Sequence, residues 1–433
     1  MLKSRLAPPD LKEFTQALPI KTLGVPSEVA LPLLQHTGKP GQPKVAVGSR
    51  VKTGTLIAEA QDYISAPIHA SICGTVKSIE TRPHPVLGEE LAIVIASDGQ
   101  DGLDETIRER KDLVSLSPDE IRKIIRACGV VGLGGAAFPT QVKLNPPKDK
   151  PVDSFILNGA ECEPYLSADH RLMLEKAKEI ILGMKTAMRV LNVKNGFVAI
   201  EENKPDAIEL FSNLLQPEDI KVVPLKSFYP QGAEKQLIKT VLKREVAPGK
   251  LPFDVGVVVN NVATAFAIYE AVYKNKPLYE RVITVGGSIV KHPANLLVRI
   301  GTKVKDILDF CGGLTEEPGK VVLGGPMMGI SQYTLEVPVI KGTSGIIVFS
   351  KAELKSFRSR PCIRCGRCLQ VCPLGLNPSA LARAIEKGRF DYAREYHVLD
   401  CIECGICSYV CPGKSNIISL VKLAKQRLKT PIS

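Results

Sequence analysis

Hydrophobic positions in the first quarter of the chain alternate with polar ones in short runs that glycine interrupts. From Glu28 onward these runs read EVALPLLQ, KVAVGSRV, GTLIAEA, YISAPIHASICGTVKSIE and ELAIVIAS. Period-two alternation with closely spaced turns is typical of strands in a small all-β sandwich. The pattern therefore predicts an all-β module over residues 1–100, although the residues before Glu28 predict no element of their own.

In the middle of the chain the period changes, and strand-like runs alternate with helical ones. After a turn-like linker over residues 100–112, Ser117-Pro118-Asp119-Glu120 has an N-cap, a proline at the first helical position and first-turn acids, and Gly129 is a natural stop. Strands are expected at 154–157, 196–202, 220–229 and 255–261, and helices at 167–190, 205–215, 232–243 and 263–274. Such alternation predicts a mainly parallel α/β sheet in a domain over residues 113–278.

The last third returns to strands and then to helices. From Arg281 the chain reads RVITVGGSIV, NLLVRIGTKVKDILDFCGGL and GKVVLGGPMMGI, so strands with Gly-Gly turns flank one short helix in a β-grasp-like module over residues 279–345. The strand GIIVFS leads into a final domain over residues 352–428, with helices expected at 377–387 and 416–428. The fold class is therefore multidomain α/β and β, and 433 residues suffice for several cores.

Composition and charge limit the expected location and binding partners of the protein. No apolar run reaches the ~18 residues that span a bilayer, and the start MLKSRLAPPDLKEF has no secretory h-region, so we expect a cytoplasmic location without a transmembrane segment. The formal charge of +12 is scattered along the chain, and tryptophan is absent, which disfavours nucleic acid as a partner. A solvated surface is the default explanation of the charge, and docking to an acidic electron carrier or to a membrane partner is the more specific one.

Eight of the twelve cysteines lie in two copies of one pattern near the end of the chain. The copies read CIRCGRCLQVCP from Cys362 and CIECGICSYVCP from Cys401, and each is C-x2-C-x2-C-x3-C-P, the run that holds [4Fe–4S] clusters in bacterial ferredoxins. In that arrangement the first three cysteines bind one cluster and the fourth binds the other. The predicted ligands are Cys362, Cys365, Cys368 and Cys411 for cluster 1, and Cys401, Cys404, Cys407 and Cys372 for cluster 2.

Zinc knuckles and a disulfide framework are the alternative interpretations of these cysteines. Zinc sites pair two C-x2-C hooks across a longer gap and need no trailing Cys-Pro, so the duplicated run favours the clusters. We expect the remaining cysteines to be buried free thiols, namely Cys73, Cys128, Cys162 and Cys311.

Three polar loops in the α/β domain form a second candidate site. The glycine loop GVVGLGGAAFPTQVK runs from Gly129 to Lys143, and glycine there lets backbone N–H groups approach a phosphate or a flat ring. Asn158 to Tyr165 follows one predicted strand, and Asn260-Asn261 ends another. Ligands bind at the carboxyl ends of parallel strands, so we expect the three loops to line one pocket.

These stretches carry resemblances to known families. Residues 28–97 are similar to the lipoyl or biotinyl barrel-sandwich family, but the hairpin Pro67-Ile68-His69-Ala70 has no lysine, which implies a structural module. GLGGAAFPT with Lys143, NGAECEP from Asn158, YPQGAE from Tyr229 and VNNVAT resemble motifs of the flavin subunit of respiratory complex I. Leu133, Ala160 and Ala263 depart from those motifs, so FMN binding carries over better than nicotinamide binding does.

The order of the modules resembles the C subunit of the Rnf complex over nearly the whole chain. The resemblance implies a peripheral, cytoplasmic, NADH-facing subunit of a membrane-bound, ion-translocating ferredoxin:NAD oxidoreductase, whose partners are the other Rnf subunits, including a ferredoxin-type one. A soluble flavoprotein reductase of the cobalamin reductase type has similar modules. A non-enzymatic electron carrier with a vacant flavin pocket is the third alternative.

The resemblance also implies roles for individual residues. Flavin can take a hydride from NADH and pass single electrons to clusters, so FMN belongs between them. The residues implied to hold FMN are Gly132, Gly134, Gly135, Lys143, Asn158, Asn260, Asn261 and Thr264. Phe138 is implied to pack near the nicotinamide, and Glu161 and Glu163 to bind NADH; the alternative for both carboxylates is a charge pair at the N-terminus of the helix after Ser167.

Overall fold

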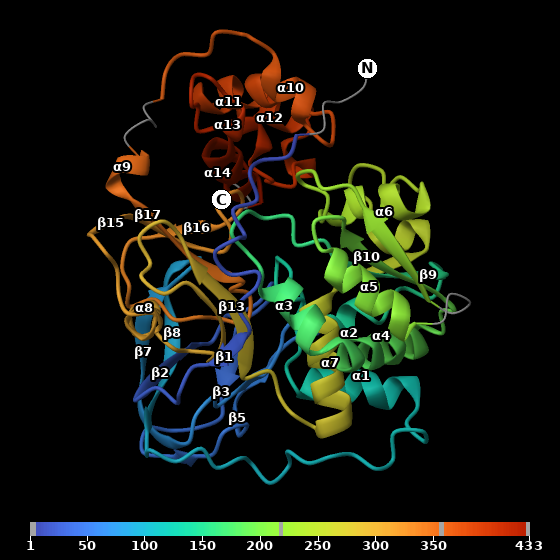
Figure 1. The fold of residues 1–433 in the computed structure, drawn as a ribbon, viewed down its shortest axis with the longest axis vertical. Coiled ribbons are helices and arrows are strands. Elements are labelled where there is room, and N and C mark those ends of the chain that lie inside the picture. Colours follow the sequence, from blue (N-terminus) through green and yellow to red (C-terminus); the bar gives the residue numbers. More distant parts are fainter. Residues whose placement is uncertain (1–5, 216–219, 355–358, 430–433) are drawn as a thin grey trace.

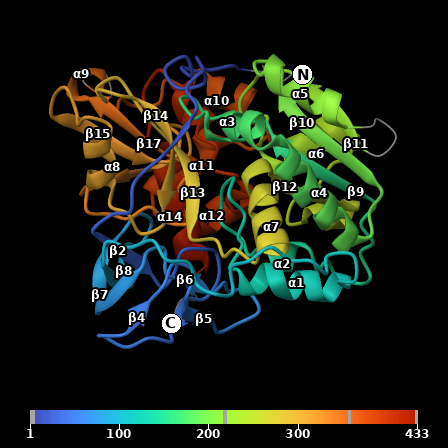
Figure 2. The same ribbon diagram turned by 60° about the horizontal axis from the view of Figure 1, so that its bottom comes forward.

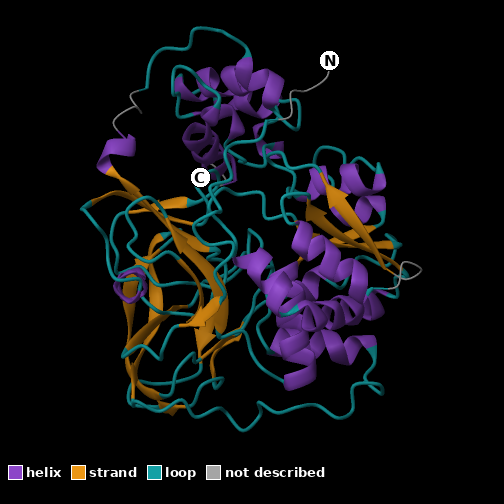
Figure 3. Cartoon of the chain, in the orientation of Figure 1, coloured by secondary structure: helices purple, strands orange, loops and turns teal. Residues whose placement is uncertain are grey.

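Four packed regions make up the protein in a computed structural model that describes residues 6–215, 220–354 and 359–429. Two β-rich regions lie beside the α/β domain, and a small helical domain lies above the β-rich half and the α/β domain (Figure 1). Colouring by secondary structure separates the strand-rich half from the helix-rich half (Figure 3). Among the described residues, no helix is both long enough and apolar enough to cross a membrane.

The N-terminal module consists of two small antiparallel sheets, as the alternating pattern predicts. One sheet has the order β2-β8-β7-β4, from β2 (Glu28–Pro32), β8 (Gly88–Ser97), β7 (Gly74–His84) and β4 (Arg50–Val51). The other is β3-β5-β6, from β3 (Gly41–Pro43), β5 (Leu56–Ala60) and β6 (Ile68–His69). Ile68 and Ala70 of the hairpin are buried, so this hairpin packs against the protein instead of swinging free.

The α/β domain is built on a parallel four-stranded sheet. Its order is β11-β10-β9-β12, from β11 (Ile220–Leu225), β10 (Asn195–Glu201), β9 (Ser154–Gly159) and β12 (Val257–Asn261). One face is covered by α1 (Pro118–Ala127), α3 (Ala168–Glu175), α4 (Ala177–Leu191), α5 (Pro205–Leu214) and α7 (Val262–Lys274). The other face is covered by α6 (Glu234–Leu242), with η1 (Pro252–Val255) beside it. The short α2 (Thr140–Lys143), at the end of the glycine loop, packs against α1.

The single helix expected at 167–190 is wrong, because the chain breaks at Lys176. That residue has φ −134° and ψ 29°, outside helical values, and separates α3 from α4. The break lets α3 pack on the neighbouring β-rich region while α4 packs on α7. Figure 2 shows α4, α7 and α1 side by side on this part of the domain. Tertiary packing therefore overrides a helical period that is continuous in the sequence.

The third region is a six-stranded mixed sheet with the order β1-β14-β13-β17-β15-β16. Its strands are β1 (Ile20–Thr22), β14 (Ala294–Arg299), β13 (Glu280–Gly286), β17 (Gly345–Ser350), β15 (Pro318–Leu323) and β16 (Ile330–Gln332). The helix α8 (Val304–Phe310) lies between β14 and β15 in the chain. β1 comes from the N-terminal segment and pairs in parallel with β14, so the first residues of the chain leave their own module.

The C-terminal domain is helical and holds both cysteine runs. Its helices are α10 (Arg367–Val371), α11 (Pro378–Glu386), α12 (Phe390–Glu395), α13 (Ile406–Tyr409) and α14 (Ile417–Lys429), with η2 (Val398–Asp400) and, just before the domain, α9 (Lys351–Leu354). The two helices expected from the sequence correspond to α11 and α14. Each cysteine run ends in a short helix, α10 or α13, that sequence periodicity does not reveal because it is about one turn long.

Candidate functional site

The glycine loop lies against the end of β12, although it follows a helix and no strand precedes it. The backbone N–H of Leu133 donates to Thr264 Oγ1 at 2.9 Å, and a Cβ on Gly134 would come within 2.9 Å of Asn261 Cβ. The glycine loop thus lies at the carboxyl end of a strand of the parallel sheet, where the sequence predicts it.

The glycine loop is held through its carbonyl groups by neighbouring modules. Thr37 of the N-terminal module donates from Oγ1 to the carbonyl of Ala136 at 2.6 Å. Arg281 donates to the carbonyl of Leu133 at 3.3 Å and is itself buried. No described atom lies within 4 Å of where a Cβ on Gly135 would stand, so the loop is open on that side. An open, glycine-lined face is what close approach of a flat or anionic ligand requires.

The hairpin that lacks the lipoyl lysine is part of this support. The buried Lys341 donates from Nζ to the carbonyls of Pro67 and Gly129, both at 2.7 Å, and so joins the hairpin to the start of the glycine loop. Burial lowers the pKa of Lys341 to about 7. Gln141 also donates to the carbonyls of Tyr63 and Ser65. The hairpin thus buttresses the site, which agrees with the expectation of a structural module.

We call the second predicted loop, residues 158–166, the acidic loop. Asn158 holds its start, because its side chain donates to the carbonyl of Gly232 at 2.9 Å and accepts from the N–H of Ala160 at 3.1 Å. A Cβ on Gly232 would stand 3.3 Å from Ala160 and 3.4 Å from Cys162. A side chain at position 232 would therefore crowd the acidic loop, so Gly232 allows the two segments to pack closely.

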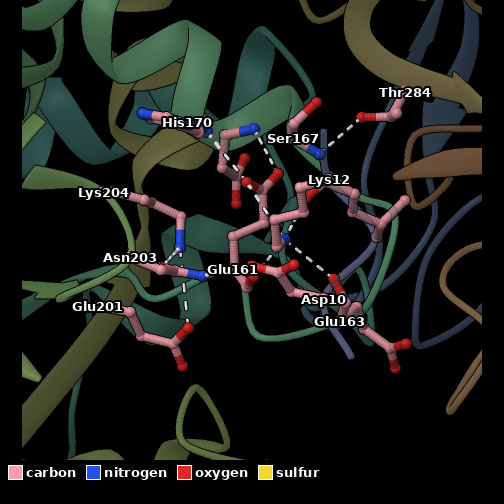
Figure 4. Close-up of polar contacts among 12 residues, drawn as sticks. Asp10, Lys12, Glu161, Glu163, Ser167, His170, Glu201, Asn203, Lys204 and Thr284 are labelled. Atoms are coloured by element: carbon pink, nitrogen blue, oxygen red, sulfur yellow. Dashed lines mark hydrogen bonds and ion pairs between the residues drawn. The ribbon is translucent and has the colours of Figure 1, made fainter. Parts of the chain in front are cut away.

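Two lysines that sequence reasoning did not select shape the acidic loop. Lys12 donates from Nζ to the carbonyls of Glu161 at 2.8 Å, Glu163 at 3.0 Å and Leu166. Lys204 donates to the carbonyl of Ala160 at 2.6 Å, and burial lowers its pKa. Figure 4 shows both ammonium groups among the polar groups of the loop. The only sequence signal for Lys12 is a charged residue within an otherwise uninformative segment, and contacts 149 residues apart leave no local pattern.

The two predicted NADH carboxylates are already engaged by donors of the protein. Glu161 accepts from the backbone N–H groups of Asp169 at 2.7 Å and His170 at 3.2 Å, at the N-terminus of α3, as the alternative interpretation expects. Glu163 instead accepts from the N–H groups of Met327 at 3.0 Å and Met328 at 2.9 Å and from Tyr229 Oη at 3.2 Å. Burial raises the pKa of Glu163, and these three donors oppose that shift.

Lys143 and the residues at the end of β12 complete the second site. Lys143 Nζ lies 2.6 Å from Glu234 Oε1 and 2.6 Å from the carbonyl of Val259. Asn261 caps α7 by accepting from the N–H of Ala263 at 2.8 Å, and its amide donates to Asp169 at 2.5 Å. Burial and the nearby Glu161 carboxylate raise the pKa of Asp169 to about 7. Phe138 is half-buried beside the glycine loop.

Unpartnered polar atoms test whether this site suits a flavin. The buried Nδ2 of Asn260 has no hydrogen-bond partner among the described residues, and neither do Nε2 and Oε1 of the fully buried Gln231. Buried amides normally find partners. A flavin offers ring carbonyls, ring nitrogens, ribityl hydroxyls and a phosphate to such groups, so the donor set fits it. Gln231 belongs to the YPQGAE stretch, where only the flanking residues carry a sequence signal.

The second cysteine run lies with Cys372 around one apolar cavity. Its lining includes Cys372, Cys401, Cys404 and Cys407, the four thiols predicted for cluster 2, together with Ile406, Ile417 and Val421. Burial and the neighbouring thiols Cys401 and Cys372 raise the pKa of Cys404 to about 12. Cys372 of the first run therefore lies close to the three thiols of the second run with which the sequence groups it.

The first cysteine run is closer to the surface. Cys362 and Cys365 are exposed, while Cys368 and Cys411 are half-buried. Burial raises the pKa of Cys368, and Cys411 is near enough to add to that shift. In the described part of the chain, no three His, Cys, Asp or Glu side chains converge as the ligands of a single metal ion do. A [4Fe–4S] cube spreads its thiolates farther apart, since each one binds a different iron atom.

The spare cysteines bear out the expectation in large part. Cys73, Cys128 and Cys311 are buried and unpaired. Cys162 is free but only half-buried, and it lies in the acidic loop in a small cluster with Tyr229, Met327, Cys404 and Ile406. This cluster is where the α/β domain, the six-stranded sheet and the second cysteine run meet.

Known proteins resemble every part of this layout. Family models match as an RnfC barrel sandwich hybrid domain over residues 2–100, a Nuo51 FMN-binding domain over 125–270, an SLBB domain over 282–331 and a 4Fe-4S dicluster domain over 355–412. An NAD+-reducing [NiFe]-hydrogenase in the air-oxidized state has a similar fold, with a TM-score of 0.50 at 18% identity over 72% of this chain and 61% of that one.

Full-length relatives are much closer in sequence. The C subunit of the proton-translocating ferredoxin:NAD(+) oxidoreductase complex of Clostridium ljungdahlii is 49% identical over 98% of this chain and 94% of its own length. The Na(+)-translocating counterpart from Acetobacterium woodii is 43% identical over 98% of this chain and 96% of its own length. The chain therefore belongs to the C-subunit family of ion-translocating ferredoxin:NAD+ oxidoreductase complexes.

Proposed function

We propose that the chain passes electrons between NAD(H), FMN and two [4Fe–4S] clusters, as a subunit of an ion-translocating ferredoxin:NAD oxidoreductase of the Rnf type. The observation that carries the proposal is the junction at which Tyr229 and Cys162 of the α/β domain pack on Cys404 and Ile406 of the second cysteine run. This packing brings the flavin-type loops next to a cluster-type cysteine run, which transfer between the two centres requires.

The FMN site is formed by the three loops. Gly132, Gly134 and Gly135 give the backbone access, and Asn158, Asn260, Asn261 and Thr264 offer polar groups around it. Lys143 supplies positive charge for the phosphate, in competition with its present partner Glu234. When bound, FMN converts a two-electron hydride transfer into single-electron steps.

The nicotinamide is proposed to stack on the flavin beside Phe138. A role of Glu161 in binding NADH hydroxyl groups competes with its existing donors, because its side chain is buried and both of its oxygens accept from the N-terminus of α3. A role of Glu163 in NADH binding competes with its three existing donors. Substitution of Glu163 by glutamine distinguishes a structural role from a role in NADH binding.

The cluster ligands are proposed as the sequence predicts them. Cluster 1 takes Cys362, Cys365, Cys368 and Cys411, and cluster 2 takes Cys401, Cys404, Cys407 and Cys372. The finer module types are proposed with them: a lipoyl-like sandwich over residues 1–100, the FMN domain over 113–278, a β-grasp over 279–345 and a ferredoxin-like domain over 352–428. We further propose that the chain lies at the cytoplasmic face of the membrane with the other Rnf subunits, including a ferredoxin-type one.

Anaerobic titration with NADH tests the proposal. The purified chain should release FMN in stoichiometric amount on denaturation, and NADH should reduce both the flavin and the clusters in optical and EPR spectra. The variant C365S should lose about half of the iron, since one of two clusters is damaged. The control variant C311A, which alters a buried thiol outside both runs, should keep all of it. Absence of FMN together with failure of NADH to reduce the clusters would leave a carrier without a flavin.

A further inference from the structure

The two cysteine runs are copies in sequence but face different surroundings. Arg364 of the first run and Glu403 of the second occupy equivalent positions and share the same unusual backbone, with φ of 58° and 57°. Three residues farther on, Arg367 corresponds to Ile406. The copies therefore have the same local conformation, and their difference lies in what the side chains meet.

The second run faces inward. Ile406 is 1% exposed and packs in the junction with Tyr229 and Cys404. Glu403 pairs with Lys425 at 2.7 Å, so its charge is compensated within the domain. A Cβ on Gly405 would stand 2.5 Å from the carbonyl of Met327, which shows how closely the six-stranded region approaches this run. The thiols predicted for cluster 2 thus lie inside the helical domain, on the side that packs against the α/β domain.

The first run faces solvent. Cys362 and Cys365 are exposed, and so are Arg360, Arg364 and Arg367. Within the described ranges, none of these three guanidinium groups is in an ion pair, unlike Glu403 in the other copy. Ile363, between two of the predicted ligands, is 69% exposed. We call the surface formed by Arg360, Ile363, Arg364 and Arg367 the arginine face.

We propose that the arginine face is the docking surface for an acidic protein that carries single electrons, and that cluster 1 exchanges electrons with it. This inference rests on the proposed function. Transfer consists of one electron passing between cluster 1 and the carrier in either direction, with no bond made or broken. Uncompensated arginines attract an acidic partner and speed its encounter, and one exposed apolar side chain suits the small interface of a transient redox complex.

An anionic membrane surface is the competing partner for these arginines. The arrangement favours a protein carrier, because the arginines alternate along the chain with the exposed cysteines predicted to bind cluster 1. Contact with a lipid surface would not require a redox centre at this position. A third possibility is that the arginines only balance the negative charge of cluster 1 and set its potential. Electron-transfer rates, vesicle binding and the potential of cluster 1 separate the three.

The test uses the full chain with both clusters, reduced by dithionite so that it does not depend on NADH. Stopped-flow spectroscopy measures electron transfer to an acidic two-[4Fe–4S] ferredoxin at low and high ionic strength. The variant R364E/R367E should react at least about tenfold more slowly at low ionic strength and lose most of its salt dependence. The control R50E/R108E changes two other exposed arginines by the same charge and should react like the parent chain.

Three results would overturn the proposal. The first is an unchanged rate and salt dependence in R364E/R367E. The second is an unchanged rate together with loss of binding to phosphatidylglycerol vesicles, which would assign the face to a membrane. The third is a slower rate that follows a shifted cluster 1 potential with the salt dependence intact. If the iron content shows that R364E/R367E assembles its clusters poorly, R364Q/R367Q provides the same comparison with about half the change in charge. Failure of NADH to reduce the chain would refute the proposed function and leave this measurement intact.

Discussion

Glu163 offers the sharpest test of how the α/β domain is joined to the rest of the chain. Its Oε1 accepts from Met328 N–H at 2.9 Å and from Tyr229 Oη at 3.2 Å, and its Oε2 accepts from Met327 N–H at 3.0 Å. The variant E163Q keeps the shape of the side chain but offers a single acceptor oxygen. Its amide nitrogen then faces a backbone N–H, and at least one half-buried donor is left without an acceptor.

The size of the effect follows from that loss. An unsatisfied buried donor costs about 1–3 kcal/mol, so the segment around Met327 should open about 5- to 150-fold more often. Hydrogen exchange followed by mass spectrometry on peptides covering residues 324–332 measures this directly. The control Y229F removes one donor and keeps the carboxylate, and its smaller cost of about 0.5–1.5 kcal/mol should produce a smaller increase in exchange.

Kinetics then separate a structural role from a role in NADH binding. Met327 lies against Gly405 of the second cysteine run, so loosening it should slow the reduction of the clusters by NADH while the KM for NADH changes little. Unchanged exchange of the Met327 segment in E163Q, combined with a raised KM for NADH, would refute the structural role and favour a contact between Glu163 and NADH.

Two further predictions concern the glycine loop and Asp169 of α3. G135A should keep the thermal stability of the parent chain, because no described atom lies within 4 Å of the added Cβ. If the flavin fills that space, this variant should release less FMN when it is denatured. G134A should release less FMN and also lose thermal stability, because its Cβ would stand 2.9 Å from Asn261. An unaltered FMN content in both variants would move the flavin away from the loop. The pKa of Asp169 is about 7 in the folded state and about 3.8 in the unfolded state. Between these pH values the folded state binds the proton and the unfolded state does not. The contribution of Asp169 to the free energy of unfolding therefore decreases as pH rises from about 4 to 7. In urea titrations at pH 5 and pH 7.5, D169N should reduce this decrease, and an identical pH dependence would contradict the raised pKa.

Features that are local in the chain could be predicted from its residues alone. The spacing of each cysteine run sets which thiols face one cluster, because a few residues with fixed turns define that geometry. The change from period-two to helical alternation predicted the parallel sheet. Ser117 marked the start of α1 as an N-cap, and the structure adds a capping box with Glu120. The glycine loop and Asn261 were identifiable because turns and caps have a residue signature.

What these parts meet depends on the folded arrangement. Lys12 reaches the acidic loop across 149 positions, and β1 joins a sheet whose other strands begin at Glu280. The helix break at Lys176 and the roles of Glu161 and Glu163 likewise depend on neighbours that are distant in sequence. The two cysteine runs show this most clearly. Their shared motif gives both the same backbone conformation at Arg364 and Glu403, but only the folded structure buries the second run against Tyr229 and leaves the first exposed to solvent. Packing between modules leaves no periodic trace in a single sequence, since each contact joins residues whose local patterns are independent.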